Sequence, residues 1–359
     1  MYDLGPELTI LDYTTPSPIV RNLASFSLDF KDNIFIAVAS TNKVHIFVVD
    51  TSLSVLAAES VLVDPEEDCL QVSEVSIVRP STRIWPYLVV ATTKSIQIFD
   101  LIFMGMRKLN IVAVLSREKL PKVTAQGDKE MAKQLKGRTN EWFGFYRGIT
   151  CVDTTIYVGN SLGQILPFYC STETNVVSKK PLHEHTGPIM DISTCRYDDI
   201  TASVDGHKEL IIWARNMKNH HHKIKLLEYP TCVEILRKHV IVGSVCGLFF
   251  LYNLQTAKLK ATVDMFKRSI TSIHTAPESA YFLVTDEDGF VNVYKLHTRK
   301  PSPFQVEHRF SEHFPDRKVF GGQFLTARGN VFSLSLYDDP VVRTFRITPK
   351  PSTEPSKNK

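Results

Sequence analysis

Short runs of alternating apolar residues recur along the whole chain, and each run ends in an aromatic side chain. Seven such aromatics can be placed, at Phe47, Phe99, Phe168, Trp213, Tyr252, Tyr294 and Phe345. In six of the seven runs a turn-forming or small pair, such as Asp288-Gly289, stands at the same distance before the aromatic. The exception is Trp213, whose Asp205-Gly206 pair lies two residues further upstream. A turn-then-strand unit repeated in this way is typical of a repeat fold.

The spacing of the aromatics predicts the kind of repeat. Successive aromatics are 52, 69, 45, 39, 42 and 51 residues apart. One blade of a β-propeller, with strands a to d from the centre outwards, needs roughly 40 to 45 residues. We therefore expect seven blades with loop insertions. The strands a to d can be assigned in two consecutive units. In the first unit they are 231–236, 239–244, 248–254 and 259–263. In the second unit they are 269–275, 281–285, 290–296 and 304–310.

The two ends of the chain predict how the ring closes. Residues 318–325, 330–336 and 341–347 supply only three strands of the last unit. Residues 8–13 precede the first strand a and have the right length, so we expect them to pair with 341–347 and remove an exposed sheet edge. The predicted fold is all-β, a single seven-bladed propeller over residues 1–347, closed by an N-terminal strand. Residues 348–359, rich in Pro, Ser and Lys, are expected to be a disordered tail.

One unit resembles a WD40 repeat, because His185-Thr186-Gly187 precedes strand a and the segment 201–206 leads to Trp213. The resemblance implies a buried hydrogen-bond network of His185, a hydroxyl of Thr201 or Ser203, Asp205 and Trp213. The last third of the chain is similar to a WD40 family of lone propellers without appended domains or catalytic residues. The matching residues are Val306-Glu307-His308, Asp316, Gly321, Phe324, Gly329-Asn330, Phe332, Tyr337-Asp338, Arg343 and Phe345.

Composition mainly excludes classes of protein. The six cysteines form no CxxC pair, which favours reduced thiols in a cytoplasmic protein. No apolar stretch reaches the length of a membrane span, and residues 1–10 lack the features of a signal peptide. The net charge of +4, with both signs mixed through most loops, disfavours nucleic-acid binding.

No pattern of catalytic or metal-binding residues stands out. Three consecutive histidines, His220 to His222, point in different directions, so a solvated c to d loop is the favoured interpretation. His183 and His185 have a spacing that a metal could use, but His185 belongs to the implied network. We predict no metal and no cofactor. If the propeller were a hydrolase, Asp191 and His274 near the channel would be the first catalytic candidates, although satisfied polar groups at strand ends are favoured.

The largest departure from the repeat is the insertion at 117–146 between the second and third units. Loops of this length are usually functional or disordered, and both interpretations stay open. Residues 128–136 have the pattern of a short amphipathic helix. In the functional interpretation, basic residues face an acidic partner and aromatics act as anchors. The candidate partner-binding residues are Lys129, Lys133, Lys136, Arg138, Trp142, Phe143, Phe145 and Arg147.

Other loops add weaker indications. In a WD40 ring the d to a and b to c loops share one face, called the top face below. There, the first d to a loop is acidic, with Asp64, Glu66, Glu67 and Asp68. On the opposite face, the apolar residues 101–106 form either an exposed patch or a buried extension that packs on Trp85, and burial is favoured.

The sequence as a whole predicts a non-enzymatic protein-interaction scaffold or adaptor, not an enzyme. It would present top-face loops and the long basic insertion to protein partners of unknown identity, alone or as a subunit of a larger complex. A propeller hydrolase using the central channel is the alternative, and a nucleic-acid-binding propeller comes third.

Overall fold

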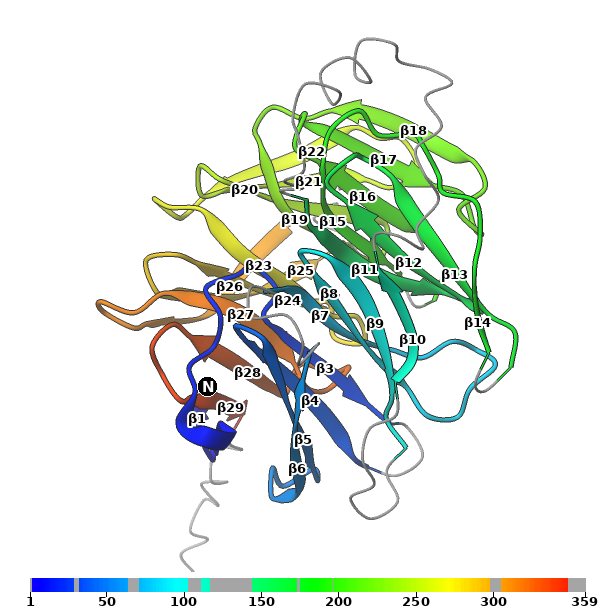
Figure 1. Cartoon of the computed structure of the whole chain (residues 1–359). Helices are drawn as coiled ribbons and strands as arrows, with labels where there is room; N and C mark the ends of the chain where they lie inside the picture. The colour runs from blue at the N-terminus through cyan, green and yellow to red at the C-terminus, as the bar shows by residue number, and fades with distance from the viewer. Residues whose placement is uncertain are drawn as a thin grey trace, which may run out of the picture.

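The computed structural model describes residues 2–28, 32–63, 71–102, 111–116, 144–172, 175–195, 197–297 and 305–347. In this part of the chain, the backbone forms strands and one short 3-10 helix, η1 (Leu11–Tyr13). The strands build seven antiparallel sheets, which are the seven blades of a propeller (Figure 1). The predicted fold is therefore confirmed. None of the described helices is long and apolar enough to cross a membrane.

Each blade takes its strands from the centre outwards in chain order. The strands are β3 (Leu23–Ser27), β4 (Ile34–Ser40), β5 (Lys43–Val49) and β6 (Val55–Leu62) in blade 1; β7 (Val72–Val78), β8 (Tyr87–Thr92), β9 (Ser95–Asp100) and β10 (Ile111–Ser116) in blade 2; β11 (Tyr146–Val152), β12 (Thr155–Asn160), β13 (Ile165–Cys170) and β14 (Val176–Ser178) in blade 3; β15 (Ile189–Thr194), β16 (Thr201–Asp205), β17 (Glu209–Trp213) and β18 (His220–Lys225) in blade 4; β19 (Pro230–Leu236), β20 (His239–Ser244), β21 (Leu248–Asn253) and β22 (Leu259–Asp264) in blade 5; β23 (Ile270–Ala276), β24 (Tyr281–Asp286), β25 (Phe290–His297) and β26 (Gln305–His313) in blade 6; and β27 (Val319–Phe324), β28 (Val331–Leu336) and β29 (Val341–Ile347) in blade 7.

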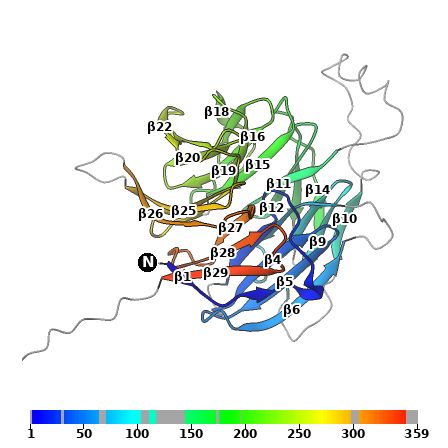
Figure 2. The same ribbon diagram turned by 90° about the vertical axis from the view of Figure 1, so that its left-hand side faces the viewer.

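The N-terminus completes blade 7, as predicted, but in two pieces. Strands β1 (Tyr2–Leu4) and β2 (Leu8–Thr9) both pair with β29, which lies beside β1 in both views (Figures 1 and 2). The single strand expected at 8–13 is wrong beyond Thr9, because η1 follows, with Asp12 and Tyr13 at positive φ. The contribution of β1 was not predicted, because Pro6, which has no N–H for the ladder, separates it from β2.

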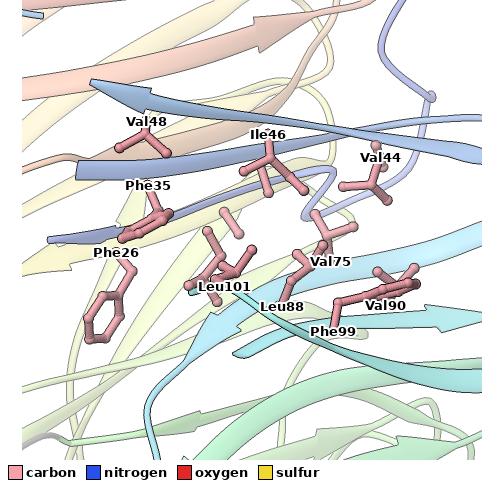
Figure 3. Packing of buried hydrophobic residues seen from close by; sticks show 14 of the residues in the cluster. Phe26, Phe35, Val44, Ile46, Val48, Val75, Leu88, Val90, Phe99 and Leu101 are labelled. Carbon is pink, nitrogen blue, oxygen red and sulfur yellow. The ribbon is translucent and has the colours of Figure 1, made fainter. Parts of the chain in front are cut away.

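The apolar core lies between neighbouring blades rather than at one centre. Phe35 and Ile46 of blade 1 pack against Leu88 and Phe99 of blade 2 (Figure 3). All seven aromatics that end the strand c runs are buried. Leu101 is buried in the same cluster, whereas Ile102 is half exposed, and residues 103–106 lie outside the described residues.

The innermost strands are fastened to one another near the top of the ring. In six of the seven blades, the inner strand carries a β-bulge close to its start. Side chains beside these bulges bond to the next blade. The Glu74 carboxylate accepts the N–H of Gly148 at 2.6 Å, and the Asp191 carboxylate accepts the N–H of Val233 at 2.7 Å. These links fix the wall of the central channel.

Candidate functional site

The central channel contains a cavity of about 490 Å³. Its wall comes from the inner strands of all seven blades and from the turns that follow them. Hydroxyl groups predominate where strands β3, β7, β11 and β15 face the cavity, with Ser25, Ser76, Thr150 and Ser193 among them. The cavity is thus a polar space in the middle of the ring.

Arg21, just before β3, crosses this channel to the opposite side of the ring. Its Nη2 lies 2.7 Å from Asp191 Oδ2 and 3.1 Å from Glu234 Oε1, and it donates to the carbonyl of Val233 at 2.9 Å. Burial raises the pKa of the Asp191 and Glu234 carboxyls, and the Arg21 guanidinium opposes that shift. Arg21 therefore ties blade 1 to blades 4 and 5 through buried charge.

The two catalytic candidates occupy different settings. Asp191 is fully buried and also accepts the N–H of Ile192 at 2.8 Å, so both carboxylate oxygens have partners. His274 lines the cavity, and its Nδ1 accepts the N–H of Phe324 at 2.9 Å. Of the two candidates, only His274 lines the cavity. Both carboxylate oxygens of Asp191 are occupied by main-chain and ionic contacts.

The residues of the implied WD40 network meet in blade 4. Ser203 Oγ lies 2.6 Å from His185 Nε2 and 2.7 Å from Trp213 Nε1, and His185 Nδ1 lies 3.2 Å from Asp205 Oδ2. Of the two hydroxyls considered, Ser203 makes these contacts, whereas Thr201 bonds to Thr194.

Asp205 also holds together the turn that contains the two extra residues. It accepts the N–H groups of Gly187, His207 and Glu209 at 2.9 to 3.1 Å. Burial alone would raise the pKa of Asp205, but the hydrogen bonds from His185 and these amides outweigh it and lower the pKa to about 2. The carboxylate is therefore ionised at neutral pH.

A metal ion is the other use that this cluster could have. Ligand atoms of His185, Asp205 and Glu209 lie within 4.8 Å of one another. However, both ring nitrogens of His185 face protein partners, and Glu209 pairs with Lys223 at 3.1 Å. Because Ser203 and Asp205 face the two ring nitrogens of His185 and Lys223 pairs with Glu209, the arrangement fits the hydrogen-bond network implied by the WD40 resemblance.

The three consecutive histidines lie on β18, the outer strand of blade 4. The prediction that they belong to a solvated c to d loop is therefore wrong. His220 Nδ1 lies 3.7 Å from Glu184, and His222 Nε2 contacts the carbonyl of Gln255 at 2.9 Å. A β-bulge at His221 interrupts the regular alternation of the strand, and His220 and His222 contact different neighbours.

The top face of blades 4 to 6 carries an exposed apolar patch that sequence analysis missed. Its members are Leu227 and Tyr229 before β19, Val245 after β20 and Met265 after β22, each between 44% and 60% exposed. Single exposed apolar residues carry no pattern signal in a sequence. Only the fold brings these three loops together.

Several contacts join the three loops that carry the patch. The N–H of Val245 donates to the carbonyl of Tyr229 at 3.0 Å. The b to c turn of blade 5 also touches the loop after β22, since a Cβ on Gly247 would lie 2.3 Å from the carbonyl oxygen of Phe266. Lys208 Nζ stands 4.3 Å from the ring centre of Tyr229. We refer to Leu227, Tyr229, Val245 and Met265 as the top-face patch.

The rim of the top-face patch carries both signs of charge. Lys208 lies 3.8 Å from Glu228, and Arg268 lies 3.6 Å from Asp288. An apolar centre with a mixed polar rim is the usual anatomy of a protein interface.

Most candidates from the long insertion fall outside the described residues, namely Lys129, Lys133, Lys136, Arg138, Trp142 and Phe143. Phe145 is half-buried next to β11. Arg147 lies on β11, where its charge opposes the rise that burial causes in the pKa of Glu74 and of Asp191. Arg147 therefore acts on the buried carboxylates of the channel, and the expectation that it faces an acidic partner is not supported by its position.

Comparison with known proteins gives one family. Residues 140–348 match the sequence model of the WDR54 family. The chain is 29% identical to human WD repeat-containing protein 54 over 216 residues, covering 56% of this chain and 63% of the relative. The mouse protein of the same name is 30% identical over 209 residues, covering 54% of this chain and 61% of the relative. The match therefore spans less than two thirds of the length of these relatives.

Solved structures agree on the fold. A chain in the crystal structure of the mitotic checkpoint complex superposes with a TM-score of 0.71 at 12% identity, covering 97% of this chain and 96% of that chain. Raptor from Chaetomium thermophilum gives a TM-score of 0.64 at 9% identity, covering 97% of this chain and 30% of that chain.

Proposed function

Because the chain belongs to the WDR54 family of WD-repeat proteins, we propose that it is a non-enzymatic scaffold for protein partners in the cytoplasm. Propellers of this kind typically mediate protein interactions. The top-face patch is the observation that carries the proposal, since four exposed apolar side chains lie on three adjoining loops. Such surfaces on otherwise polar proteins usually mark binding sites.

The long insertion at 117–146 is the second surface of this scaffold. It follows β10 and precedes β11, and in the described strands the d to a connections lie on the same face as the patch. Its basic residues favour an acidic partner, and Trp142 and Phe143 serve as anchors. The scaffold acts as an adaptor or as a subunit of a larger complex.

Affinity purification of variants tests this function. We expect Tyr229→Ser with Met265→Ser to lose partners that the wild type retains, and deletion of residues 119–140 to lose an overlapping set. Leu259→Ser is the matched control, because Leu259 is an exposed apolar residue on β22 at the side of the ring. An unchanged partner set in both the double variant and the deletion would contradict the proposal.

The hydrolase alternative depends on His274, the catalytic candidate that reaches the cavity. Turnover of esters, lactones or phosphoesters that disappears in His274→Ala would favour it over the scaffold. Oligonucleotide binding that falls steeply with salt would favour the nucleic-acid alternative.

A further inference from the structure

Blade 5 and the outer part of blade 4 have few acidic side chains. Between Glu234 and Asp264 the sequence contains no Asp or Glu, but it contains four Lys or Arg residues. Residues 210–227, which include β18, contain no Asp or Glu either, and they contain four further Lys or Arg residues. Cations without acidic neighbours create a positive potential at the surface, unless other segments supply carboxylates.

Several of these cations lie where the bottom face, formed by the a to b and c to d turns, meets the outer side of the ring. The turn 254–258 of blade 5 touches the segments on both sides of it. Its Gln255 carbonyl lies 2.9 Å from His222 Nε2 on β18, and the N–H of its Leu254 donates to the carbonyl of Lys238 at 2.9 Å. Strands β18 and β22 lie close together in both views (Figures 1 and 2). The basic corner consists of Lys218, His220, His222, Arg237, Lys238, Lys258 and Lys260, and its Lys and Arg side chains are all exposed.

The described residues around the basic corner do not neutralise its charge. None of its Lys or Arg side chains forms an ion pair with a described carboxylate, and His220 stands 3.7 Å from Glu184. The described acids in the bottom turns of blades 4 and 5 are Asp198 and Asp199, and Asp199 pairs with Arg215 at 3.1 Å. The local potential is therefore positive.

Protection of strand edges explains only part of this charge. Charged side chains on an outer strand hinder its pairing with another chain, and Lys260 on β22 serves that purpose. Lys218, Lys238 and Lys258 stand in turns, where there is no strand edge to protect. Their charge points to a ligand of the opposite sign.

We propose that the basic corner docks the ring on an anionic lipid surface. Leu259, which is 42% exposed, stands between Lys258 and Lys260 on the outer edge of blade 5. An apolar side chain flanked by cations suits the boundary between lipid headgroups and acyl chains. Clusters of roughly four to eight basic residues are typical of surfaces that bind anionic lipids.

Two other polyanions fit this surface less well. Single-stranded nucleic acids stack their bases on exposed aromatic side chains, and in residues 210–263 the exposed Phe, Tyr or Trp is Tyr229, on the opposite face. An acidic protein segment needs partners in a fixed geometry. The Lys side chains of the basic corner donate no hydrogen bond to another described residue, so their positions are not fixed in this way. A lipid surface, whose headgroups move, needs no such geometry.

The basic corner lies on the face opposite the top-face patch. Lipid docking therefore leaves that patch open to protein partners, and the proposal does not depend on the scaffold function. Because the basic corner binds lipid rather than protein, Leu259→Ser also remains a valid control for the purification of protein partners.

Co-sedimentation of the full chain with vesicles tests the proposal. We expect binding to vesicles of equal parts phosphatidylcholine and phosphatidylserine, and little binding to phosphatidylcholine alone. Lys258→Glu with Lys260→Glu should weaken binding by at least about tenfold, since each cation near an anionic surface contributes about 1 kcal/mol and tenfold needs 1.4 kcal/mol. Lys267→Glu with Lys318→Glu is the matched control, because it changes the net charge equally at two exposed lysines of the top-face loops. This control should retain binding within about twofold.

Two further variants separate the contributions. Leu259→Ser should weaken binding to the mixed vesicles by about threefold, because less apolar surface enters the lipid. Deletion of residues 119–140 should leave most of the binding, although that segment is basic as well. Thermal unfolding verifies that each variant keeps its fold, as expected for changes at exposed positions.

Four results would overturn the proposal. The first is equal binding to the two kinds of vesicle, and the second is an equal loss in the two double variants. The third is loss of binding in the deletion variant, which would assign it to the insertion. The fourth is binding of an oligonucleotide or of polyglutamate that Lys258→Glu with Lys260→Glu abolishes while vesicle binding is unchanged, which would make a nucleic acid or an acidic protein the occupant.

Discussion

At the residue scale, Ser203 is the centre of the buried network in blade 4. One hydroxyl serves both His185 and Trp213, at 2.6 and 2.7 Å. The WD40 resemblance left Thr201 and Ser203 as alternatives, because strand residues two apart face the same side of a sheet. The register with the neighbouring strands, which sequence alone does not supply, places Thr201 beside Thr194 instead.

Replacing this hydroxyl should therefore be costly. We expect Ser203→Ala to lower the free energy of unfolding by about 2 to 4 kcal/mol, because two buried polar groups lose a partner. Thr201→Ala removes one neutral hydrogen bond and should cost about 1 kcal/mol. Urea denaturation measures both. A larger effect for Thr201→Ala would make Thr201 the network hydroxyl.

Glu74 should make the stability depend on pH. Burial and the nearby Asp191 raise the pKa of Glu74 from 4.5 to about 7, although Arg21, Arg147 and the Gly148 amide act in the opposite direction. The folded state therefore binds this proton more tightly than the unfolded chain does. The stabilisation is complete below about pH 4.5 and is lost as the pH rises to about 7.

Glu74→Gln isolates this contribution. The amide still accepts one main-chain N–H but cannot ionise, so the fall in unfolding free energy between pH 4.5 and 7 should shrink by up to about 3 kcal/mol. Part of the pH-dependent fall in unfolding free energy should remain in this variant, because burial raises the pKa of Asp191 and of Glu234 as well. Denaturation midpoints at several pH values measure the fall in both proteins. Asp264→Asn, a change at an exposed residue of β22, should not alter the slope.

At the element scale, the strands were more predictable than their connections. Strand c runs such as Phe290–His297 combine a turn pair, alternation and an aromatic five residues after the turn, and each of these is a local signal. The β-bulges that fasten Glu74 and Asp191 to the next blade depend on contacts between blades, so no local pattern predicts them. The top-face patch was missed for the same reason, since its residues come from three separate loops.

The closing strands provide a test at this scale. Tyr2 of β1 packs edge-on against Phe310 and Phe332, with ring centres 5.2 and 4.9 Å apart, and its hydroxyl donates to the carbonyl of Gly329. Tyr2→Ala should lower the unfolding free energy by about 3 kcal/mol, as for other buried aromatics. Tyr13→Ala is the control, because Tyr13 is 80% exposed. Equal midpoints of thermal unfolding for the two variants would show that β1 does not hold the ring closed.

At the scale of the whole molecule, closure links blades that are far apart in the sequence. The first and last described strands pair in blade 7, while Arg21 of the N-terminal segment bonds to Asp191 and Glu234 across the channel. Sequence patterns predicted the number of blades and the joined ends, because both follow from the repeat and from a missing strand. They did not predict the ion pairs in the channel, because Arg21 and Glu234 are 213 residues apart and neither lies in a motif.

This closure predicts that distant blades open together. Cys170 in blade 3 and Cys232 in blade 5 are fully buried, and burial raises the pKa of Cys170 to about 11 and of Cys232 to about 12. Neither thiol should react in the folded ring, because the thiolate is the nucleophile. Exposed Cys246 provides the fast reference within the same molecule.

In denaturant, reaction with a thiol reagent should label Cys170 and Cys232 at one shared rate, the rate of global unfolding. Deleting residues 2–9 removes β1 and β2, which touch neither blade 3 nor blade 5, yet it should accelerate both labelling reactions by the same factor. Mass spectrometry of the labelled cysteines reports each rate separately. If Cys232 reacted faster than Cys170 in either protein, individual blades would open on their own, and the ring would behave as a row of repeats with independent local stability.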